Sequence, residues 1–322
     1  MPSVLVTGAA GFVGRSACRR LVREGWTVRG AIRSREGLES LAAGVEPVIV
    51  GDIGGATDWS PVLKDVEAVV HLAARAHVMT DTAVDPLAAY RATNLQGTRR
   101  LAEAAAAAGI GRFVFMSSIK VNGEGAPLPY TERDPARPED AYGVTKWEAE
   151  QSLMELALRS SLRPTILRSP LVYGPGVKGN FLRLLEVISK GLPLPFASIR
   201  NRRSLVFVGN LADAIAASLR QTPARPRTFL VSDGEDVSTS ELLRRLGQAL
   251  GRTALLFPFP PFLLRAGGRL AKREAVTKRL LSSLAVDSSA IRAELGWKPP
   301  YPMSHGLQDT AAWFRSTRGG DR

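Results

Sequence analysis

The strongest constraint on the fold lies in the first 14 residues, where three glycines follow directly after a short apolar run. The segment reads Thr7-Gly8-Ala9-Ala10-Gly11-Phe12-Val13-Gly14, and a helical pattern begins at its end. Gly8 allows a tight turn, Gly11 lets the backbone approach a pyrophosphate, and Gly14 lets the helix pack against the strand. The N-terminus of that helix would offer N–H groups and positive potential to the phosphates. The spacing and its context therefore predict a dinucleotide-binding loop rather than a structural turn alone.

Short β-branched runs alternate with longer helical patterns through the first half of the chain. Strands are predicted at 4–6, 28–32, 48–50, 68–72, 113–116 and 165–167, and helices at 11–23, 86–108 and 140–159. This alternation predicts an α/β fold with a Rossmann-type, doubly wound parallel sheet.

Proline and glycine become frequent after Leu171, which indicates a smaller, less regular C-terminal α+β region. We expect an NAD(P)-binding domain over residues 1–172 and a substrate-binding domain over 173–203 and 233–322. Residues 204–232 hold one further helix pattern and one strand pattern, so they are expected to return to the main sheet. A helix start is expected at Ser238, because Glu241 follows three residues later.

The second predicted strand lacks the acidic residue that would hold an adenosine ribose. Arg33 stands at its end, with Arg35 nearby. A carboxylate would repel a 2′-phosphate, whereas a guanidinium pairs with it. The cofactor is therefore predicted to be NAD or NADP, with NADP favoured. The alternative is that Arg33 is an exposed loop arginine.

Tyr142 and Lys146 lie at the start of a predicted helix with a spacing that puts both on one face. A nearby ammonium lowers the pKa of a phenol, so Tyr142 could exchange a proton with a substrate oxygen near neutral pH. Twenty-four residues earlier, a predicted strand ends in Ser117 and Ser118, where a hydroxyl could bond the same substrate oxygen. In a doubly wound sheet both segments would meet at the carboxyl edge, near the cofactor.

With these motifs the chain resembles the extended short-chain dehydrogenase/reductase family, in its nucleotide-sugar epimerase/dehydratase branch, over nearly its whole length. The resemblance implies the catalytic residues Ser118, Tyr142 and Lys146. It implies cofactor contacts by Gly8, Gly11, Phe12, Val13, Gly14, Arg33, Asp52, Ile53, Leu72, Ala73, Ala74, Asn94, Tyr142 and Lys146. It implies substrate contacts by Ser117, Ser118, Lys120, Asn180 and Arg203, the last of them with the substrate diphosphate. Relatives commonly pair through two helices, here 86–108 and 140–159, so a homodimer is expected.

The reaction class follows from the residues after Ser118. Sugar dehydratases of this branch carry an Asp-Glu pair there, whereas this chain has Ile119 and Lys120, so a 4,6-dehydratase is not expected. The resemblance implies NAD(P)-dependent hydride transfer at a sugar carbon, with C4 favoured, of a nucleotide-diphosphate sugar such as a UDP-hexose. Either a 4-epimerase or a 4-keto-sugar reductase would use the same three residues.

Three alternatives stay open. A redox-inactive regulator would typically lose the tyrosine or the lysine, and both are present. An NADPH-dependent reductase of a non-sugar carbonyl would have no diphosphate for Arg203. The same chemistry could also act on a lipid-diphosphate-linked sugar at the membrane surface.

The net charge is unusual for such an enzyme. The 322 residues include 43 Lys and Arg against 30 Asp and Glu, a formal charge of +13. No nucleic-acid-binding motif accompanies this charge, so we expect an anionic nucleotide-sugar substrate and no nucleic acid. Residues 262–284 gather six basic residues and one acid. They could form a basic amphipathic segment at an anionic membrane, but Gly267-Gly268 interrupts the pattern, which favours a helix packed on the core.

The few cysteines and histidines bear on disulfide formation and on metal binding. The single cysteine, Cys18, excludes an internal disulfide and is expected to be a small buried side chain. His71, His77 and His305 are too scattered for a zinc site, so no metal is expected, and neither His71 nor His77 is expected to be catalytic. No secretory pattern and no long apolar stretch are present, and a cytoplasmic location is expected.

Overall fold

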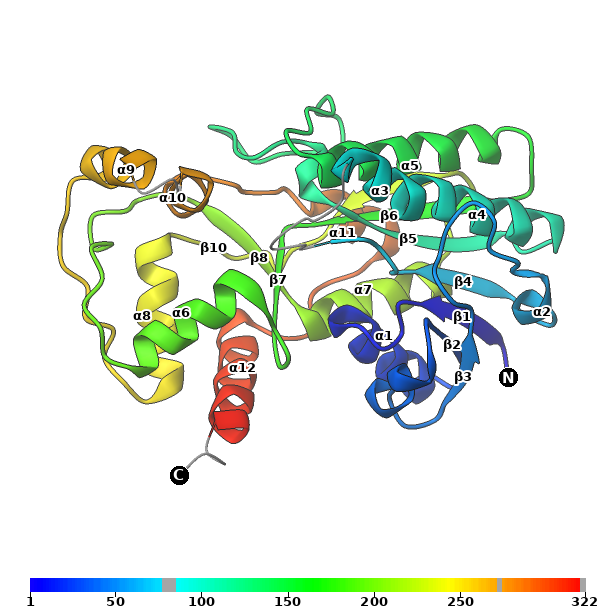
Figure 1. The fold of residues 1–322 in the computed structure, drawn as a ribbon, viewed down its shortest axis with the longest axis horizontal. Coiled ribbons are helices and arrows are strands. Elements are labelled where there is room, and N and C mark those ends of the chain that lie inside the picture. Colours follow the sequence, from blue (N-terminus) through cyan, green and yellow to red (C-terminus); the bar gives the residue numbers. More distant parts are fainter. Residues whose placement is uncertain (77–84, 271–273, 319–322) are drawn as a thin grey trace.

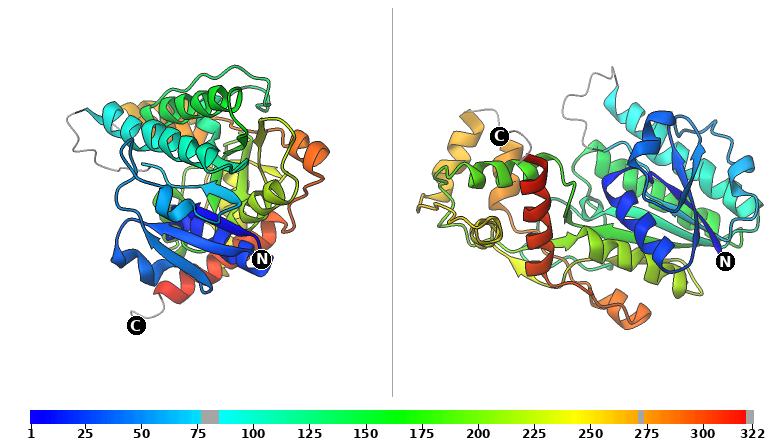
Figure 2. Two further views of the ribbon diagram at one scale, coloured as in Figure 1. Left: turned by 90° about the vertical axis from the view of Figure 1, so that its right-hand side faces the viewer. Right: turned by 90° about the horizontal axis from the view of Figure 1, so that it is seen from below.

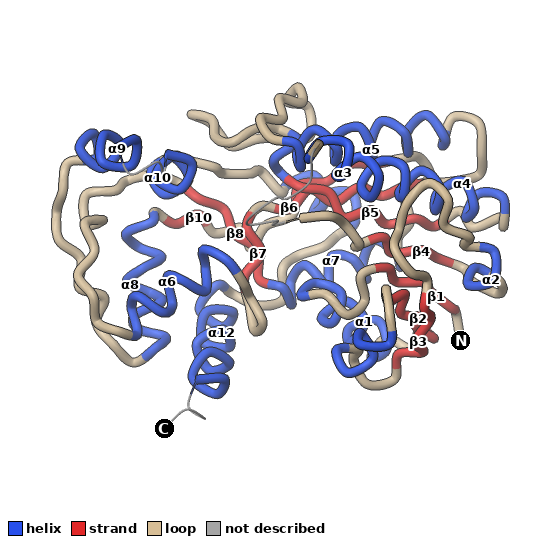
Figure 3. Tube along the Cα trace, viewed as in Figure 1, coloured by secondary structure: helices blue, strands red, loops and turns tan. Residues whose placement is uncertain are grey.

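The computed structural model describes residues 1–76, 85–270 and 274–318. His77 and part of the basic segment, residues 271–273, therefore lie outside the described residues. The chain forms two parts of unequal size, a large sheet with its helices on the right of Figure 1 and a smaller part on the left. Figure 3 shows that most of the strands belong to the larger part.

Seven parallel strands form the main sheet in the order β3-β2-β1-β4-β5-β6-β9. Their bounds are β1 (Ser3–Thr7), β2 (Thr27–Ile32), β3 (Val45–Ile49), β4 (Ala68–His71), β5 (Arg112–Ser118), β6 (Arg163–Ser169) and β9 (Arg227–Leu230). The winding direction reverses between β1 and β4, and such a reversal leaves a crevice outside the carboxyl ends of the strands. The predicted doubly wound α/β fold is confirmed.

Helices cover both faces of this sheet (Figure 2). They are α1 (Phe12–Arg23), α2 (Ser60–Leu63), α3 (Pro86–Arg91), α4 (Thr98–Ala107), α5 (Ala141–Ala157), α7 (Val208–Arg220) and α11 (Ser289–Leu295). The alternation of β1 shows how the faces differ, because Val4 and Val6 enter the core with α1 and α7, whereas Leu5 enters the core with α4 and α5. Two short 3-10 turns, η1 (Arg35–Ser40) and η3 (Ile119–Val121), follow β2 and β5.

The helix predicted over 86–108 is observed as three consecutive helical segments without a gap, and only the middle one is not α-helical. Between α3 and α4 the chain widens into a π-helical stretch, η2 (Ala92–Gly97). The carbonyl of Asn94 accepts a bond from the Thr98 hydroxyl (2.6 Å), and the Asn94 side chain bonds the backbone of Arg75 instead of facing solvent. Insertions of this kind in helices frequently occur at functional sites.

The smaller part is built on a three-stranded sheet in the order β10-β8-β7. Its elements are β7 (Leu171–Tyr173), α6 (Gly179–Ser189), β8 (Arg203–Phe207), β10 (Asp236–Val237), α8 (Thr239–Leu250), α9 (Pro261–Leu270), α10 (Glu274–Leu281) and α12 (Met303–Arg318). The aromatic side chains of Tyr173, Phe181 and Phe207 pack together at its core. The predicted start of α8 is confirmed, since the Ser238 hydroxyl caps the helix by accepting from the Glu241 N–H.

Residues 204–232 are shared between the two sheets. Most of β8 pairs with β7 and β10 in the small sheet, whereas α7 packs on α1 and β9 joins the edge of the main sheet beside β6. The functional division into a cofactor domain and a substrate domain stays a prediction.

The basic segment of residues 262–284 differs from expectation in its first half. α9 continues through Gly267 and Gly268 to Leu270, so the glycine pair does not interrupt it. Phe262 and Leu270 on α9 are 67% and 87% exposed, so this helix is not packed on the core, whereas Leu281 at the end of α10 is buried. Glycine lowers helix propensity by only about 1 kcal/mol, which a neighbouring helix can offset.

None of the helices in the described residues is long and apolar enough to cross a membrane. Nowhere within residues 1–76, 85–270 and 274–318 do three or more His, Cys, Asp or Glu side chains gather as a metal site would require.

Candidate active site

The glycine loop has the geometry of a phosphate cradle. Gly8 adopts a φ of +68°, and a Cβ there would stand 2.9 Å from the backbone nitrogen of Ala73. A Cβ on Gly14 would lie 2.0 Å from the Gly8 carbonyl oxygen, so any side chain would push α1 away from the loop. Gly11 caps α1 without a side chain, which leaves the helix N-terminus open to an anion. These residues fit a dinucleotide, with Phe12 and Val13 half-buried behind them against the smaller part.

A buried hydrogen-bond network joins the loop to the end of β4. The Thr7 hydroxyl oxygen accepts from the N–H groups of Leu72 and Ala73 (3.2 Å each) and lies 2.6 Å from Nδ1 of His71. Nε2 of His71 is 2.9 Å from the Thr98 hydroxyl, which donates to the Asn94 carbonyl. Burial and the charge of Lys146 lower the pKa of His71 to about 3, so the ring is neutral. The His71 ring therefore holds the Thr7 and Thr98 hydroxyls in place and does not exchange protons near neutral pH.

Asn94 connects this network to α5. Its carboxamide oxygen accepts from the Arg75 N–H (2.8 Å), and its nitrogen donates to the Thr145 hydroxyl (3.1 Å). Thr145 precedes Lys146 on α5, so Asn94 fixes the segment after β4 relative to that helix. Leu72, Ala73 and Ala74 lie half-buried in this segment, beside the glycine loop.

The structure brings Ser118 and Tyr142 together. Ser118 ends β5 and Tyr142 lies in the first turn of α5, close enough for the Ser118 side chain to act on the pKa of Tyr142. Asp140 caps the helix by accepting from the Gly143 N–H (2.8 Å), and Tyr90 packs edge-on to the Tyr142 ring. Burial chiefly raises the pKa of Tyr142, Asp140 and Tyr90 raise it further, and the Ser118 hydrogen bond opposes them. Tyr142 is therefore protonated at rest.

Lys146 points to a different neighbour than the sequence suggested. Its ammonium donates to the Met116 carbonyl (2.7 Å) and lies 4.4 Å from the centre of the Phe115 ring. The expected lowering of the Tyr142 pKa by this ammonium is therefore not observed, because the lysine side chain runs along β5. Burial lowers the pKa of Lys146 itself to about 7, and the charge of Glu150 acts in the opposite direction.

Behind Lys146 lies a buried ion pair that sequence reasoning missed. Arg168 on β6 and Glu150 on α5 have side chains only 5% and 2% exposed and bond through two guanidinium nitrogens (2.5–3.2 Å). Ser117 donates its hydroxyl to the same carboxylate, and Asn122 accepts from Arg168 (2.9 Å). The Ser117 side chain is thus turned toward the core, which does not favour its predicted contact with substrate.

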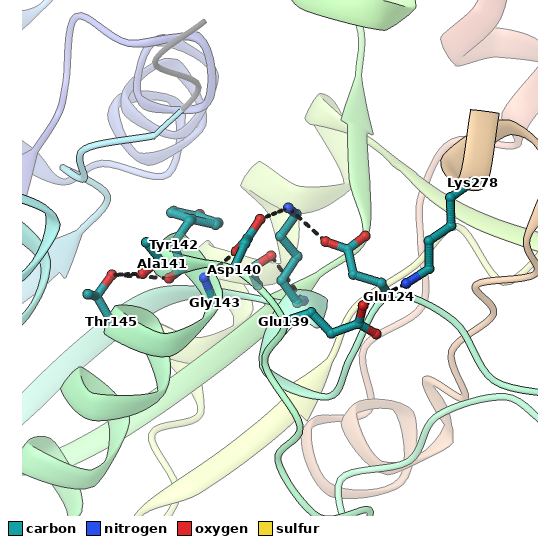
Figure 4. A network of polar contacts seen from close by, with 10 residues as sticks. Glu124, Glu139, Asp140, Ala141, Tyr142, Gly143, Thr145 and Lys278 are labelled. Carbon is teal, nitrogen blue, oxygen red and sulfur yellow. Dashed lines mark hydrogen bonds and ion pairs between the residues drawn. The ribbon is translucent and has the colours of Figure 1, made fainter. Parts of the chain in front are cut away.

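Lys120 lies near Tyr142 in a small cluster of charges (Figure 4). Its ammonium forms ion pairs with Asp140 and with Glu124 (2.9 Å to the latter). Ile119 is buried in the adjacent core, so neither residue could act as the Asp-Glu pair of a dehydratase. Next to the cluster, Lys278 of α10 pairs with Glu139 (2.6 Å). This ion pair connects the smaller part to the residues just before α5.

The position expected for the adenosine ribose holds an exposed ion pair. Arg33 and Asp52 meet at 2.7 Å with side chains 80% and 83% exposed. Ile53 is half-buried against Gly97, where a Cβ would stand 2.6 Å from an Ile53 methyl group. Arg33 therefore has a carboxylate partner that sequence reasoning did not assign to it.

The two predicted substrate residues of the smaller part lie on different elements, β8 and α6. Arg203 begins β8 half-buried and donates from Nη1 to the Ser282 carbonyl (3.2 Å). Asn180 lies exposed in the first turn of α6.

Several residues around the site gave no clear signal in the sequence. Tyr90 packs on Tyr142, and the Arg75 guanidinium lies 5.4 Å above the Tyr90 ring. Asp140 could have been found, because an Asp two residues before Tyr142 at a helix start is a capping signal.

A sequence model described as the NAD dependent epimerase/dehydratase family matches residues 4–232. The chain belongs to this family. It is 43% identical over 316 residues to a UDP-glucose 4-epimerase of Vibrio cholerae, covering 97% of this chain and 95% of the relative. It is also 26% identical over 324 residues to an N-acetyl-α-D-glucosaminyl-diphospho-ditrans,octacis-undecaprenol 4-epimerase of Escherichia coli O157:H7, with 96% and 94% covered.

Among solved structures, MoeE5 in complex with UDP-glucuronic acid and NAD is similar with a TM-score of 0.79 and 26% identity. The match covers 98% of this chain and 99% of the other. The family assignment confirms the resemblance drawn from the motifs, and with it an NAD-dependent enzyme of the extended short-chain dehydrogenase/reductase type.

Proposed function

We propose that this enzyme catalyses reversible hydride transfer at C4 of a nucleotide-diphosphate sugar. The observation that carries the proposal is the position of Ser118 at the carboxyl end of β5 beside Tyr142 in the first turn of α5, with Lys146 on the same helix. It stands beside a glycine loop that fits a dinucleotide. A bound nicotinamide cofactor supplies the hydride acceptor and donor.

The roles of the chain's own residues follow from their protonation. Tyr142 holds its proton at rest, so it can deliver that proton to a C4 carbonyl oxygen and recover one from a C4 hydroxyl. Ser118 donates or accepts at the same oxygen and orients it. Lys146, with its pKa lowered to about 7, can carry the compensating charge while Tyr142 is ionised.

A sugar diphosphate is the substrate class best supported by the whole chain. Arg203 offers a guanidinium fork suited to phosphate oxygens. Relatives whose names specify 4-epimerases of UDP-glucose or of a diphospho-linked sugar cover nearly the full chain. The Asp140–Lys120–Glu124 cluster stands beside the tyrosine and would face the sugar ring.

Two outcomes of this chemistry are distinguished by how the cofactor is used. The V. cholerae relative supports a 4-epimerase, which recycles a tightly held cofactor. A 4-keto-sugar reductase is supported by the protonated resting state of Tyr142 and by Arg33 at the adenosine end.

The choice between NAD and NADP depends on Arg33 and Asp52. We infer that Arg33 binds a 2′-phosphate and so favours NADP, while Asp52 weakens this preference by pairing with it. Replacing Asp52 by Asn should strengthen NADP binding relative to NAD, and Arg33→Gln should weaken it. Calorimetric titration of both cofactors measures each ratio, and unchanged ratios in both variants would remove the role of the pair.

A nucleotide-sugar panel with and without added NADPH tests the function itself. Epimer formation without added cofactor identifies the epimerase, whereas stoichiometric NADPH oxidation with a 4-keto sugar identifies the reductase. Failure of every nucleotide sugar, with cofactor bound, would contradict the proposed substrate class.

We also propose a homodimer that pairs through α4 and α5. Light scattering of the purified protein tests it, and a monomer at all concentrations would refute it.

A further inference from the structure

The helix α9 has the organisation of a membrane-surface helix. With 3.6 residues per turn, positions 262, 263, 266 and 270 fall within about 100° of one another. Phe262, Leu263 and Leu270 on this face are 67%, 44% and 87% exposed. Leu264, on the opposite side, is half-buried, and α9 packs against α10. The apolar face is therefore turned to solvent rather than to the protein.

Basic side chains border this face. Arg265 and Arg269 follow one another along the edge of the apolar arc, and both are exposed. The sequence of α9 contains no acidic residue. We call Phe262, Leu263, Arg265, Arg269 and Leu270 the α9 surface. An apolar face bordered by arginines is the pattern of helices that lie in the plane of a bilayer interface.

Apolar side chains are also exposed in the segment that precedes α9 in the sequence. The segment before α9 exposes Leu255 and Phe257, at 52% and 42%, and pairs with the backbone of Leu194. Figure 1 places this segment and α9 at the end of the molecule farthest from the main sheet. Large apolar side chains that gather on an exposed surface mark interaction sites.

The charge identifies the occupant. A second copy pairing through the same helix would bring its own Arg265 and Arg269 against these two arginines, which is unfavourable. An anionic bilayer offers both a negative headgroup layer and an apolar interior just beneath it. The ten residues of α9 are too few to span a membrane, so the helix would lie parallel to its surface.

We propose that the α9 surface docks this enzyme on an anionic lipid bilayer. Phe262, Leu263 and Leu270 would enter the boundary between headgroups and acyl chains, while Arg265 and Arg269 contact lipid phosphates. The inference does not depend on the proposed reaction, because it rests on exposure and charge outside the catalytic residues.

Docking would also place a basic cavity at the bilayer surface. A cavity of about 360 Å³ lies at the base of α9, and its lining includes Arg200, Arg265 and Ser283. Arg203 bonds the carbonyl of Ser282, the residue before Ser283, so the cavity borders the arginine predicted to hold a diphosphate.

Co-sedimentation of the full chain with vesicles tests the proposal. Vesicles of phosphatidylglycerol and phosphatidylcholine should pellet the protein at low salt, pure phosphatidylcholine should pellet much less, and high salt should release it. The double variants F262S/L270S and R265Q/R269Q should each lose at least tenfold in vesicle affinity. Because these side chains are exposed, thermal unfolding of the variants should match that of the parent.

Matched controls lie at the other end of the molecule. Leu158 is 90% exposed at the end of α5, and Arg19 is exposed on α1. L158S and R19Q should bind vesicles as the parent does. No binding by the parent at low salt, or equal losses in the control variants, would overturn the proposal. A change in oligomeric state that appears only in the α9 variants would assign the surface to self-association and overturn it as well.

Turnover of a water-soluble nucleotide sugar separates this inference from the proposed function. F262S/L270S should retain parental turnover, because neither side chain touches the Ser118–Tyr142 site. Vesicle binding without sugar turnover would contradict the proposed function alone, whereas turnover without vesicle binding would contradict the docking alone.

Discussion

The carboxyl edge of the main sheet and the α9 surface depart from ordinary burial in opposite directions. At the sheet edge, polar and charged side chains such as Glu150 and Lys146 are buried. At the α9 surface, large apolar side chains such as Phe262 and Leu270 are exposed. Both arrangements cost free energy unless something compensates.

The compensation differs between the two regions. At the sheet edge it lies within the chain, because Glu150 meets Arg168 and Ser117, and Lys146 meets the Met116 carbonyl. At the α9 surface the chain supplies no cover for Phe262 or Leu270 among its described residues. We conclude that the first region is organised for chemistry inside the protein and the second for contact outside it.

The largest expected effect concerns the sheet edge. Tyr142→Phe removes the hydroxyl that moves the proton, so turnover should fall by about 10²–10⁴-fold. Cofactor affinity should change little, because the ring and its contact with Tyr90 remain. Steady-state turnover and cofactor titration measure the two effects, and undiminished activity would contradict the assigned role.

Breaking the buried ion pair should cost more stability than breaking an exposed one on the same helix. Arg168→Met leaves the Glu150 carboxylate without its cation and should destabilise the fold by about 3–5 kcal/mol. The control Arg91→Met removes the partner of Glu148, in a pair whose side chains are 42% and 26% exposed, and should cost less than about 1 kcal/mol.

Denaturant unfolding of both variants and of E150L/R168M measures this difference. The double variant should recover most of the loss, since an apolar pair leaves no buried charge. Equal costs for Arg168→Met and Arg91→Met would show that burial does not decide the strength of these pairs.

The neutral His71 ring predicts a specific acid sensitivity. Its pKa is lowered from 6.5 to about 3, so between these values the unfolded chain binds a proton that the folded chain does not. This contribution is fully present above pH 6.5 and is lost progressively as the pH falls toward 3. His71→Gln should therefore lose less stability over that window than the parent. Unfolding free energies measured across this pH range test the prediction, with His305→Gln, at a half-buried position, as the control.

The smallest expected effect is at the α9 surface. Leu270→Ser should change the free energy of unfolding by no more than about 0.5 kcal/mol, because the side chain is exposed. Leu243→Ala, in the buried face of α8, should cost about 2–5 kcal/mol. A large loss for Leu270→Ser would show that α9 contributes to the core and would weaken the contrast between the two regions.

Local signals predicted the fold and the cofactor loop well. Gly8, Gly11 and Gly14 constrain one turn and one helix start, and most strands of the main sheet contain a short apolar run that is visible in isolation. Ser238 and Glu241 marked a helix start for the same reason.

What escaped prediction depends on contacts between distant segments. The π-helical stretch η2 contains Asn94, whose side chain bonds the backbone of Arg75, 19 residues earlier. The pairing of Arg168 with Glu150 and the direction of Lys146 depend on how α5 lies on β5 and β6. The exposure of α9 was missed because a helical apolar pattern does not show whether its face meets the core or the solvent.

The most direct test of the central claim follows the hydrogen at C4. UDP-hexose deuterated at C4 is incubated with the enzyme and with NAD or NADP, and the cofactor is analysed by mass spectrometry. Hydride transfer at C4 predicts deuterium on the nicotinamide while the 4-keto sugar is present, and in an epimerase its return to C4 of the epimer. Neither should occur with Tyr142→Phe. Deuterium that is lost to water while the sugar still reacts would contradict the account.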